Sequence, residues 1–184
     1  MIRNESDTGL PERFEIVRGE VVPLSPTGGK HGYVEQRIGR VLGHEGEDAD
    51  LGTPFVGEVG VVVVRDPQTV RGADAAFLLK EQMPPEETPE GYLLTPPALV
   101  AEVLSPNDRA SYVQAKVLEY LSAGVRVVWV VDPSTRSVAV YLKGATARIL
   151  TGDETLIAPG VLDNLRTPEA WLFKGLPQSD QPPL

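Results

Sequence analysis

Long apolar runs dominate the middle of this chain and predict the strands of a central sheet. They occupy residues 55–65, 73–79, 99–104 and 127–131. The last two runs are almost continuously apolar, which is typical of parallel strands buried on both faces. Shorter β-prone runs near the two ends of the chain predict antiparallel hairpins. These are residues 14–17 with 21–24, and residues 137–142 with 147–150.

Two segments carry apolar residues at helical spacing. The first covers about residues 30–43, and its apolar face consists of Val34, Ile38, Val41 and Leu42. The second follows the turn at residues 105–108, which supplies a helix N-cap, and ends at Gly124. Its position between two buried strands favours a right-handed parallel crossover. Residues 171–173 predict a last short helix.

The segments between these elements are polar and contain many turn-forming residues. Residues 44–52 are acidic and predict a loop, while residues 81–97 are rich in proline and glutamate and predict an exposed excursion with a mobile tip. At 184 residues, the chain fits one ordinary domain. We therefore predict a single domain over residues 12–173, between an N-terminal tail over 1–11 and a Pro-rich C-terminal tail over 174–184.

Charge restricts the function classes. The 26 acidic residues against 17 Lys and Arg give a net charge of -9, which opposes loose binding to nucleic acid or to anionic membranes. A nuclease site remains compatible with this charge, because a bound metal ion reverses it locally. Overall, a hydrophobic fraction of 41% and a charged fraction of 23% are typical of globular proteins.

The absence of cysteine excludes disulfides and thiolate metal sites, and two histidines are too few for a histidine-rich zinc centre. The N-terminus lacks the apolar core of a signal peptide, and no apolar stretch approaches the ~18 residues of a membrane-spanning helix. We therefore expect a cytoplasmic protein without membrane association.

Glu102 is a single carboxylate within the apolar run over residues 99–104. An ionised carboxylate there costs several kcal/mol unless a partner, a metal ion or a raised pKa compensates for its burial. A structural ion pair, or a position at the solvated end of the strand, would explain Glu102 if it stood alone. It does not stand alone, because the run over residues 73–79 also carries a single acid, Asp74.

Lys116 supplies a positive charge on the helix that follows Glu102. Helical geometry places it about 60° from Val113, at the border of the apolar face, so that its ammonium can reach inward. A snorkelling surface lysine is the alternative.

Two acids on neighbouring strands and one ammonium suit a divalent cation and a phosphodiester. Mg²⁺ would take oxygens from Asp74, Glu102 and the main-chain carbonyl of Val103. Lys116 would then orient a water molecule or neutralise charge that develops on the phosphate.

Several sequence blocks combine these residues in a fixed order. They are residues 25–32 (SPTGGKHG), 70–77 (VRGADAAF), 99–106 (LVAEVLSP) and 129–133 (WVVDP), with Lys116, Tyr120, Gly124 and Val125 between the last two. Over about residues 12–173, they resemble the Uma-two family of putative restriction endonucleases. The resemblance implies a PD-(D/E)XK nuclease fold of the mixed α/β (α+β) class, with a restriction-endonuclease-like core whose central sheet is flanked by helices. It also implies Mg²⁺-dependent cleavage of DNA, with Mn²⁺ as a substitute ion.

The resemblance assigns roles residue by residue. Asp74 corresponds to the first acid and Glu102 to the second. The lysine that usually follows the second acid by two residues is Leu104 here, and Lys116 on the next helix takes its place. His31 falls on a position that the family tends to keep. It would contact phosphate or assist proton transfer, and helix capping or packing is the alternative.

Other positions are weaker candidates or departures from the family pattern. Glu20 and Glu35 are weaker candidates, for which we expect solvated surface. Ala73 replaces a Pro before the first acid, Tyr112 stands where many relatives have Asp, and residues 127–128 are Val where many have Glu-Tyr. The Ala73 departure removes no ligand, whereas the others would count against activity if the replaced Asp or Glu serves the site. The acidic balance favours a second interpretation, a non-catalytic homodimeric interaction or regulatory protein on the same nuclease fold, and the intact set of Asp74, Glu102 and Lys116 favours the first.

Overall fold

The computed structural model describes residues 9–83 and 90–177. Its strands are β1 (Phe14–Val17), β2 (Glu20–Pro23), β3 (Gly52–Arg65), β4 (Gln68–Leu79), β5 (Leu99–Val103), β6 (Val127–Asp132), β7 (Ser137–Leu142) and β8 (Arg148–Thr151). Its helices are α1 (Gly29–Leu42), α2 (Ala110–Ala123) and the short η1 (Gly43–Glu47), η2 (Lys80–Gln82) and η3 (Glu169–Phe173). Within these two ranges, no helix has the length and apolar character needed to cross a membrane.

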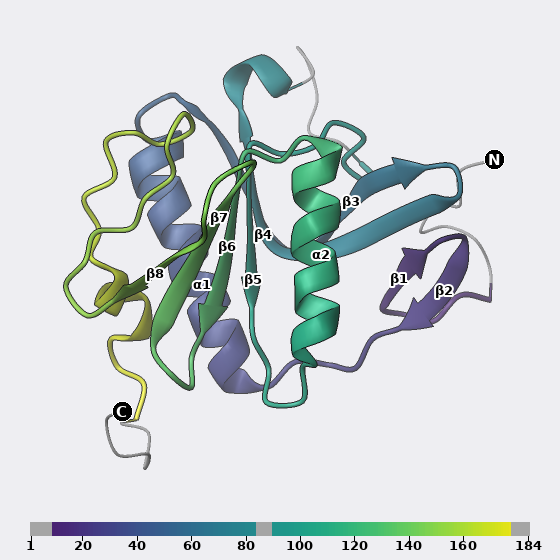
Figure 1. The fold of residues 1–184 in the computed structure, drawn as a ribbon, viewed down its shortest axis with the longest axis horizontal. Helices are drawn as coiled ribbons and strands as arrows, with labels where there is room; N and C mark the ends of the chain where they lie inside the picture. Colours follow the sequence, from purple (N-terminus) through teal and green to yellow (C-terminus); the bar gives the residue numbers. More distant parts are fainter. Residues whose placement is uncertain (1–8, 84–89, 178–184) are drawn as a thin grey trace.

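The strands form one mixed sheet in the order β2-β1-β4-β5-β6-β7-β8, with β3 also paired to β4. β5 and β6 run parallel and are connected through α2, whereas the other neighbouring strands run antiparallel. α1 packs on one face of the sheet and α2 on the other (Figure 1). This arrangement confirms the predicted mixed α/β class, both terminal hairpins and the parallel crossover.

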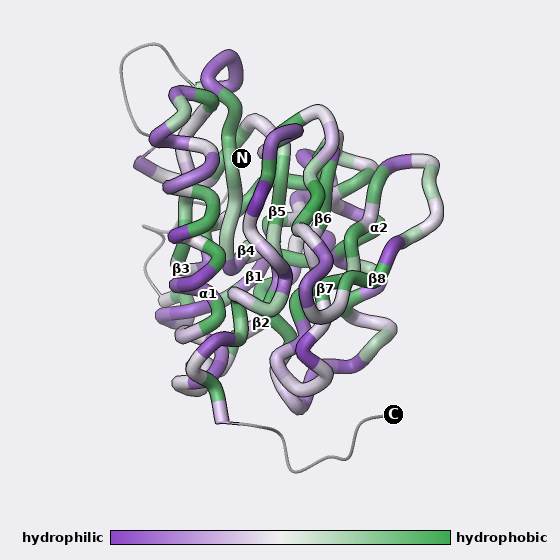
Figure 2. The backbone as a smooth tube through the Cα atoms, turned by 90° about the vertical axis from the view of Figure 1, so that its left-hand side faces the viewer, coloured by the Kyte–Doolittle hydropathy of each residue, from purple (hydrophilic) through white to green (hydrophobic). Residues whose placement is uncertain are grey.

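The sheet separates two hydrophobic cores. On one face, Ile38 of α1 packs in a buried cluster with Trp129 of β6. On the other face, Val117 and Tyr120 of α2 pack with Val100 of β5. Figure 2 shows the hydrophobic strands in the middle, with a helix on either side. Full burial of one such side chain contributes roughly 1.5–3 kcal/mol, so the two cores fix the positions of both helices relative to the sheet.

β4 is flanked differently along its two edges. β3 pairs with β4 along its whole length on one edge. The other edge is divided, because β1 pairs with it at Val70 and β5 pairs with it over residues 75–77. Residues 71–74 therefore lie between two diverging strands, and we call this stretch the β4 gap. On this edge, the side chains of Glu15 and Lys116, rather than a strand, contact the backbone of Gly72.

A β-bulge interrupts β3 opposite this region. The register with β4 shifts between Val56 and Val59, and the two intervening residues, Gly57 and Glu58, have φ angles of 93° and 60°. Gly57 suits its conformation because a residue without a Cβ enters the left-handed region without steric cost. The bulge turns the Gly57 N–H away from the ladder, toward α1.

Two sequence predictions about irregular segments are wrong. Residues 44–52 do not begin as a plain loop, because α1 continues directly into the π-helical turn η1. The segment over 81–97 is not exposed throughout, because Leu93 is buried and exchanges two backbone hydrogen bonds with β3. The apolar side chain of Leu93 explains its burial, and its paired backbone extends the sheet locally. The predicted mobile tip falls in residues 84–89, outside the described residues.

The predicted N-cap of the second helix is also wrong. Asp108 Oδ2 accepts a hydrogen bond from the Ser105 N–H at 2.7 Å, so this carboxylate closes the preceding turn. α2 begins after Arg109 without a side-chain cap. Its predicted end is confirmed, because Gly124 closes it with a φ of 113°. The predicted tails, 1–11 and 174–184, lie largely outside the described residues.

Candidate active site

Lys116 reaches inward from α2 to the β4 gap, as its position at the border of the apolar face predicts. Its Nζ donates to Glu102 Oε2 at 2.6 Å and to the Gly72 carbonyl at 3.0 Å, and it lies 3.1 Å from Glu15 Oε1. The side chain is 11% exposed. Burial lowers the pKa of Lys116, but the carboxylates of Glu102 and Glu15 outweigh burial and raise it. Lys116 is therefore a buried ammonium with three acceptors.

Glu102 is buried on β5 and both of its oxygens are bound. Oε2 accepts from Lys116, and Oε1 accepts from the Tyr120 hydroxyl at 2.7 Å. Burial raises the pKa of Glu102 to about 7, although the charge of Lys116 opposes this shift. The cost of a carboxylate in an apolar strand is thus offset by one cation and one hydroxyl, both supplied by α2.

Glu15 extends this arrangement from β1. Its Oε1 accepts from the Gly72 N–H at 3.0 Å, and its Oε2 accepts from Arg71 at 2.7 Å and from the Tyr112 hydroxyl. Burial opposes ionisation of Glu15, but Lys116, Tyr112 and Arg71 together lower its pKa. Sequence analysis did not identify Glu15, because it lies in a short strand of mixed polarity rather than in an apolar run.

Arg71 completes the group. Its Nε donates to Glu119 Oε2 at 2.6 Å, and its guanidinium is as buried as the Glu15 carboxylate. Although burial lowers the pKa of Arg71, its two carboxylate partners raise it. Burial and Glu15 raise the pKa of Tyr112 to about 12, so its hydroxyl stays protonated and donates. We call this interconnected group the lysine network: Glu15, Arg71, Glu102, Tyr112, Lys116, Glu119 and Tyr120.

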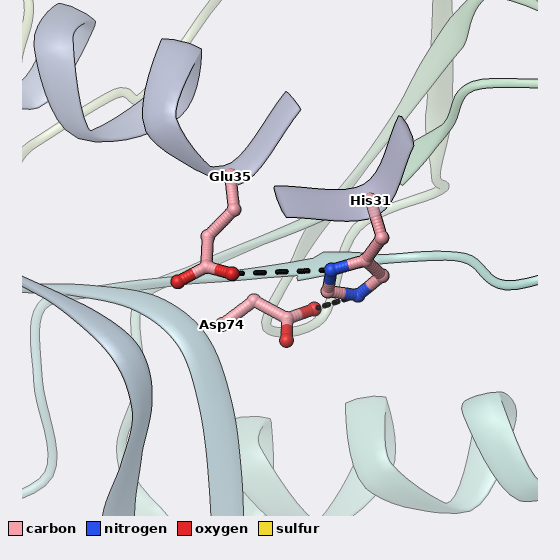
Figure 3. A group of neighbouring side chains, drawn as sticks. All are labelled: His31, Glu35 and Asp74. Atoms are coloured by element: carbon pink, nitrogen blue, oxygen red, sulfur yellow. Dashed lines mark ion pairs between the residues drawn. The ribbon is translucent and has the colours of Figure 1, made fainter. Parts of the chain in front are cut away.

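A second group surrounds Asp74 at the end of the β4 gap. Asp74 Oδ2 accepts from the Val103 N–H at 2.6 Å and lies 3.2 Å from His31 Nε2. His31 and Glu35 project from α1, one helical turn apart, and both carboxylates face the imidazole, Glu35 at Nδ1 and Asp74 at Nε2 (Figure 3). We call His31, Glu35 and Asp74 the histidine cluster. One potential ligand atom from each residue lies within 4.8 Å of the other two.

The β3 bulge positions Glu35. Its Oε1 accepts from the Gly57 N–H at 2.6 Å, while its Oε2 lies 3.9 Å from His31 Nδ1. Burial raises the pKa of Glu35, and the nearby charge of Asp74 raises it further. Burial lowers the pKa of His31, but Asp74, Glu35 and the Val103 backbone outweigh burial and raise it. The cluster thus concentrates negative charge around one imidazole.

The structure brings the predicted residues to adjacent strands but divides them between two groups. Asp74 on β4 and Glu102 on β5 are neighbours in the sheet, as predicted. Within the described residues, however, the tight group of potential ligands contains His31, Glu35 and Asp74 and omits Glu102. Val103 contacts both Asp74 and His31 through its main chain. The assignment of Asp74, Glu102 and Val103 as metal ligands stays a prediction.

The two weaker candidates have different outcomes. Glu20 is exposed on β2, as expected. The expectation of solvated surface is wrong for Glu35, whose side chain is 16% exposed. A signal for Glu35 was present in the sequence, because residues four apart on a helix face the same side and His31 precedes it by four. Its burial depends on the bulge at residues 57–58, which no local pattern reveals.

Comparison with known proteins gives matches to a family model and to solved structures. The sequence model of the Uma2 family, described as "Putative restriction endonuclease", matches residues 6–170. The crystal structure of a putative nuclease belonging to DUF820 from Anabaena variabilis ATCC 29413 superposes with a TM-score of 0.75. It is 21% identical, and the superposition covers 87% of this chain and 89% of that chain. No curated protein matches the chain.

Proposed function

We propose that this chain, which belongs to the Uma2 family of putative restriction endonucleases, is a divalent-metal-dependent endonuclease that hydrolyses DNA phosphodiester bonds. One observation carries the proposal. Lys116 meets the second acid, Glu102, at 2.6 Å, although it follows that acid by 14 residues and comes from a different element. The family pattern of two acids and a lysine is therefore compatible with this chain.

The buried acids beside the β4 gap fit a divalent ion. Asp74, Glu102 and the Val103 carbonyl would hold Mg²⁺ or Mn²⁺, because hard cations prefer oxygen ligands. Glu102 can accept an ion while it keeps its two hydrogen bonds, since a carboxylate has about four lone-pair sites. When bound, the ion supplies a Lewis acid and a water molecule of lowered pKa.

The side chains around these acids would do the remaining work. The Lys116 ammonium would neutralise charge that develops on the phosphate and orient the attacking water. Glu15 and Glu102 keep this ammonium protonated and fixed. His31, next to Asp74, would contact the phosphate or transfer a proton.

Cleavage of supercoiled and linear plasmid DNA with Mg²⁺ or Mn²⁺ tests the proposal. Glu102→Gln keeps the shape of the side chain and removes its charge. We expect its cleavage rate to fall by about 10²- to 10³-fold, which is the range for removal of one preorganised electrostatic group. His44→Ala is the matched control, because His44 is 83% exposed and lies outside both groups. Equal cleavage by wild type and Glu102→Gln would contradict the assignment of Glu102.

A non-catalytic homodimeric or regulatory protein on this fold is the second candidate. Glu102 and Lys116 have a complete set of hydrogen-bond partners within the protein. This supports the second candidate, because such a set suits a structural ion pair as well as a catalytic one. A net charge of -9 also opposes DNA binding. Absence of cleavage with either ion, together with a stable dimer in sedimentation analysis, would replace the first candidate with the second.

A further inference from the structure

We infer that His31, Glu35 and Asp74 bind a divalent first-row transition-metal ion, with the imidazole as one ligand, and that this site selects Mn²⁺ over Mg²⁺. The inference deepens the proposed function and rests on it for the purpose of the ion. The ligands differ from those of the proposed function, because here the ion lies between α1 and β4 and does not require Glu102.

The His31 ring carries a buried nitrogen without a hydrogen-bond partner among the described residues. His31 is 7% exposed, and its Nδ1 has no hydrogen-bond partner among the described residues. A buried polar atom without a partner costs about 1–3 kcal/mol, and such an atom in a native structure indicates a missing partner. Nδ1 points toward Glu35, the side on which the acidic charge gathers (Figure 3).

The side chains of the histidine cluster are spaced for an ion rather than for direct hydrogen bonds on the Nδ1 side of the ring. His31 Nδ1 and Glu35 Oε2 are 3.9 Å apart, too far for a hydrogen bond. Two adjacent ligand atoms of one octahedral ion are about 3 Å apart, since each bond to a divalent ion is about 2.0–2.2 Å, so a side-chain shift of about 1 Å brings this pair to one ion. Asp74 lies on the same side of the ring and holds it in place at Nε2, 3.2 Å away. It contributes an oxygen either to the ion or to the orientation of the imidazole.

The two carboxylates of the histidine cluster are preorganised by the backbone. The Gly57 N–H fixes Glu35, and the Val103 N–H fixes Asp74. Both carboxylates are thus held by backbone donors, which keeps them in place without neutralising them. A cation would relieve the repulsion between them, and that repulsion contributes to the raised pKa of Glu35. Imidazole is a better ligand for transition ions than for Mg²⁺, whereas carboxylates suit Mn²⁺ well.

Binding of Mn²⁺ to the purified full chain tests this inference without any need for cleavage. We expect wild type to bind one ion per chain, as measured by the loss of the free Mn²⁺ signal in electron paramagnetic resonance. Glu35→Gln and His31→Ala should each weaken binding by about 10- to 100-fold or more. His44→Ala is the matched control, because His44 also has a carboxylate four residues later, Asp48, but both side chains are exposed. It should bind as wild type does.

A second readout needs no variant. The chain has two histidines, so the ring signals of His31 and His44 are the whole histidine set in a nuclear magnetic resonance spectrum. Substoichiometric Mn²⁺ should broaden the His31 signals and leave those of His44 sharp, because paramagnetic broadening falls steeply with distance. A tenfold excess of Mg²⁺ should not displace the ion.

Glu102→Gln separates this inference from the proposed function. Retained Mn²⁺ binding in that variant supports the histidine cluster, even if no cleavage is found for wild type. Loss of binding in Glu102→Gln, with normal binding in Glu35→Gln, would overturn the inference and place the ion on Asp74 and Glu102. Absence of binding by wild type at millimolar Mn²⁺, or equal broadening of both histidines, would also overturn it.

Discussion

The lysine network and the histidine cluster meet at the same four residues of β4 but satisfy their charges in different ways. In the lysine network, Lys116 has three acceptors and both oxygens of Glu102 are bound. In the histidine cluster, two carboxylates share one imidazole, whose Nδ1 has no hydrogen-bond partner in the described part of the chain. One group is internally complete, and the other places two carboxylates around one imidazole whose Nδ1 is left unbonded by the described residues.

We infer from this difference that the lysine network stabilises the fold, whereas the histidine cluster binds a ligand. A buried ion pair with complete hydrogen bonding affects the stability of the fold mainly because removal of one partner leaves the other charge buried and unpaired. A preorganised group with excess charge costs stability in the free protein and recovers that cost when its ligand binds. Removal of a charge should therefore have opposite effects on stability in the two groups.

The largest effect is expected from Lys116→Met. This change keeps the apolar stem but leaves Glu102 buried without its cation and Glu15 with Arg71 alone, so the free energy of unfolding should fall by about 3–5 kcal/mol. Urea denaturation followed by circular dichroism measures it. Lys80→Met is the control, because its ion pair with Asp50 is exposed and its loss should change stability by no more than about 0.5 kcal/mol. Equal losses in the two variants would show that the lysine network does not stabilise the fold.

An intermediate effect is expected at Glu169, a buried carboxylate on η3 that belongs to neither group. Neither of its oxygens has a hydrogen-bond partner among the described residues. Burial raises the pKa of Glu169 to about 7, with an opposing effect from the Gly152 backbone and a supporting one from the charge of Glu154. The folded state therefore favours the neutral acid. The stability that Glu169 contributes is complete below its ordinary pKa of 4.5 and is lost as the pH rises toward 7.

Glu169→Gln should remove this pH dependence. The variant should exceed wild type in stability by about 1–3 kcal/mol at pH 8, and the advantage should shrink as the pH falls to 5. Thermal unfolding at a series of pH values measures the difference. Glu90→Gln, at an exposed position, should show the same pH dependence of stability as wild type. A constant difference between Glu169→Gln and wild type would refute the assignment of a raised pKa.

The smallest effect, and the one opposite in sign to that of Lys116→Met, is expected from Glu35→Gln. Without metal, loss of a charge next to Asp74 should stabilise the chain by about 0.5–1 kcal/mol, because burial and Asp74 both disfavour the ionised Glu35. Saturating Mn²⁺ should reverse the order by stabilising wild type more than the variant. Asp48→Asn, also four residues after a histidine but exposed, should show neither effect in a thermal shift assay. Destabilisation of ion-free Glu35→Gln would make Glu35 a structural residue.

The lysine network was partly predictable because its members break apolar patterns. Glu102 interrupts a run of strand residues, and Lys116 lies at the edge of a helical stripe, so each is conspicuous in the sequence alone. The central strands and the parallel crossover followed from the same runs, whereas the order of the strands in the sheet did not. Glu15 was not predictable, because its burial results from the approach of Lys116 and Arg71, which come from two other elements.

The histidine cluster was predictable only in part. Asp74 and His31 were identified, whereas Glu35 looked like a solvated residue on an amphipathic helix. Its partner, the Gly57 N–H, becomes available only because β3 bulges 22 residues later in the sequence. A bulge depends on the competition between two strand registers, and this competition involves the whole sheet. Leu93 was missed for the same reason, since its backbone partners belong to β3.

The place of Lys116 on α2 links the site to the mobility of one helix. A lysine two residues after Glu102 would share its strand and would stay beside it as long as the sheet persists. Lys116 instead depends on the docking of α2 through Val117 and Tyr120. Any opening that lifts α2 off an intact β5 withdraws the ammonium and leaves both acids in place. Such local openings precede global unfolding in many proteins, so the amide protons of α2 report, through their exchange with solvent, what fraction of the molecules has an assembled site.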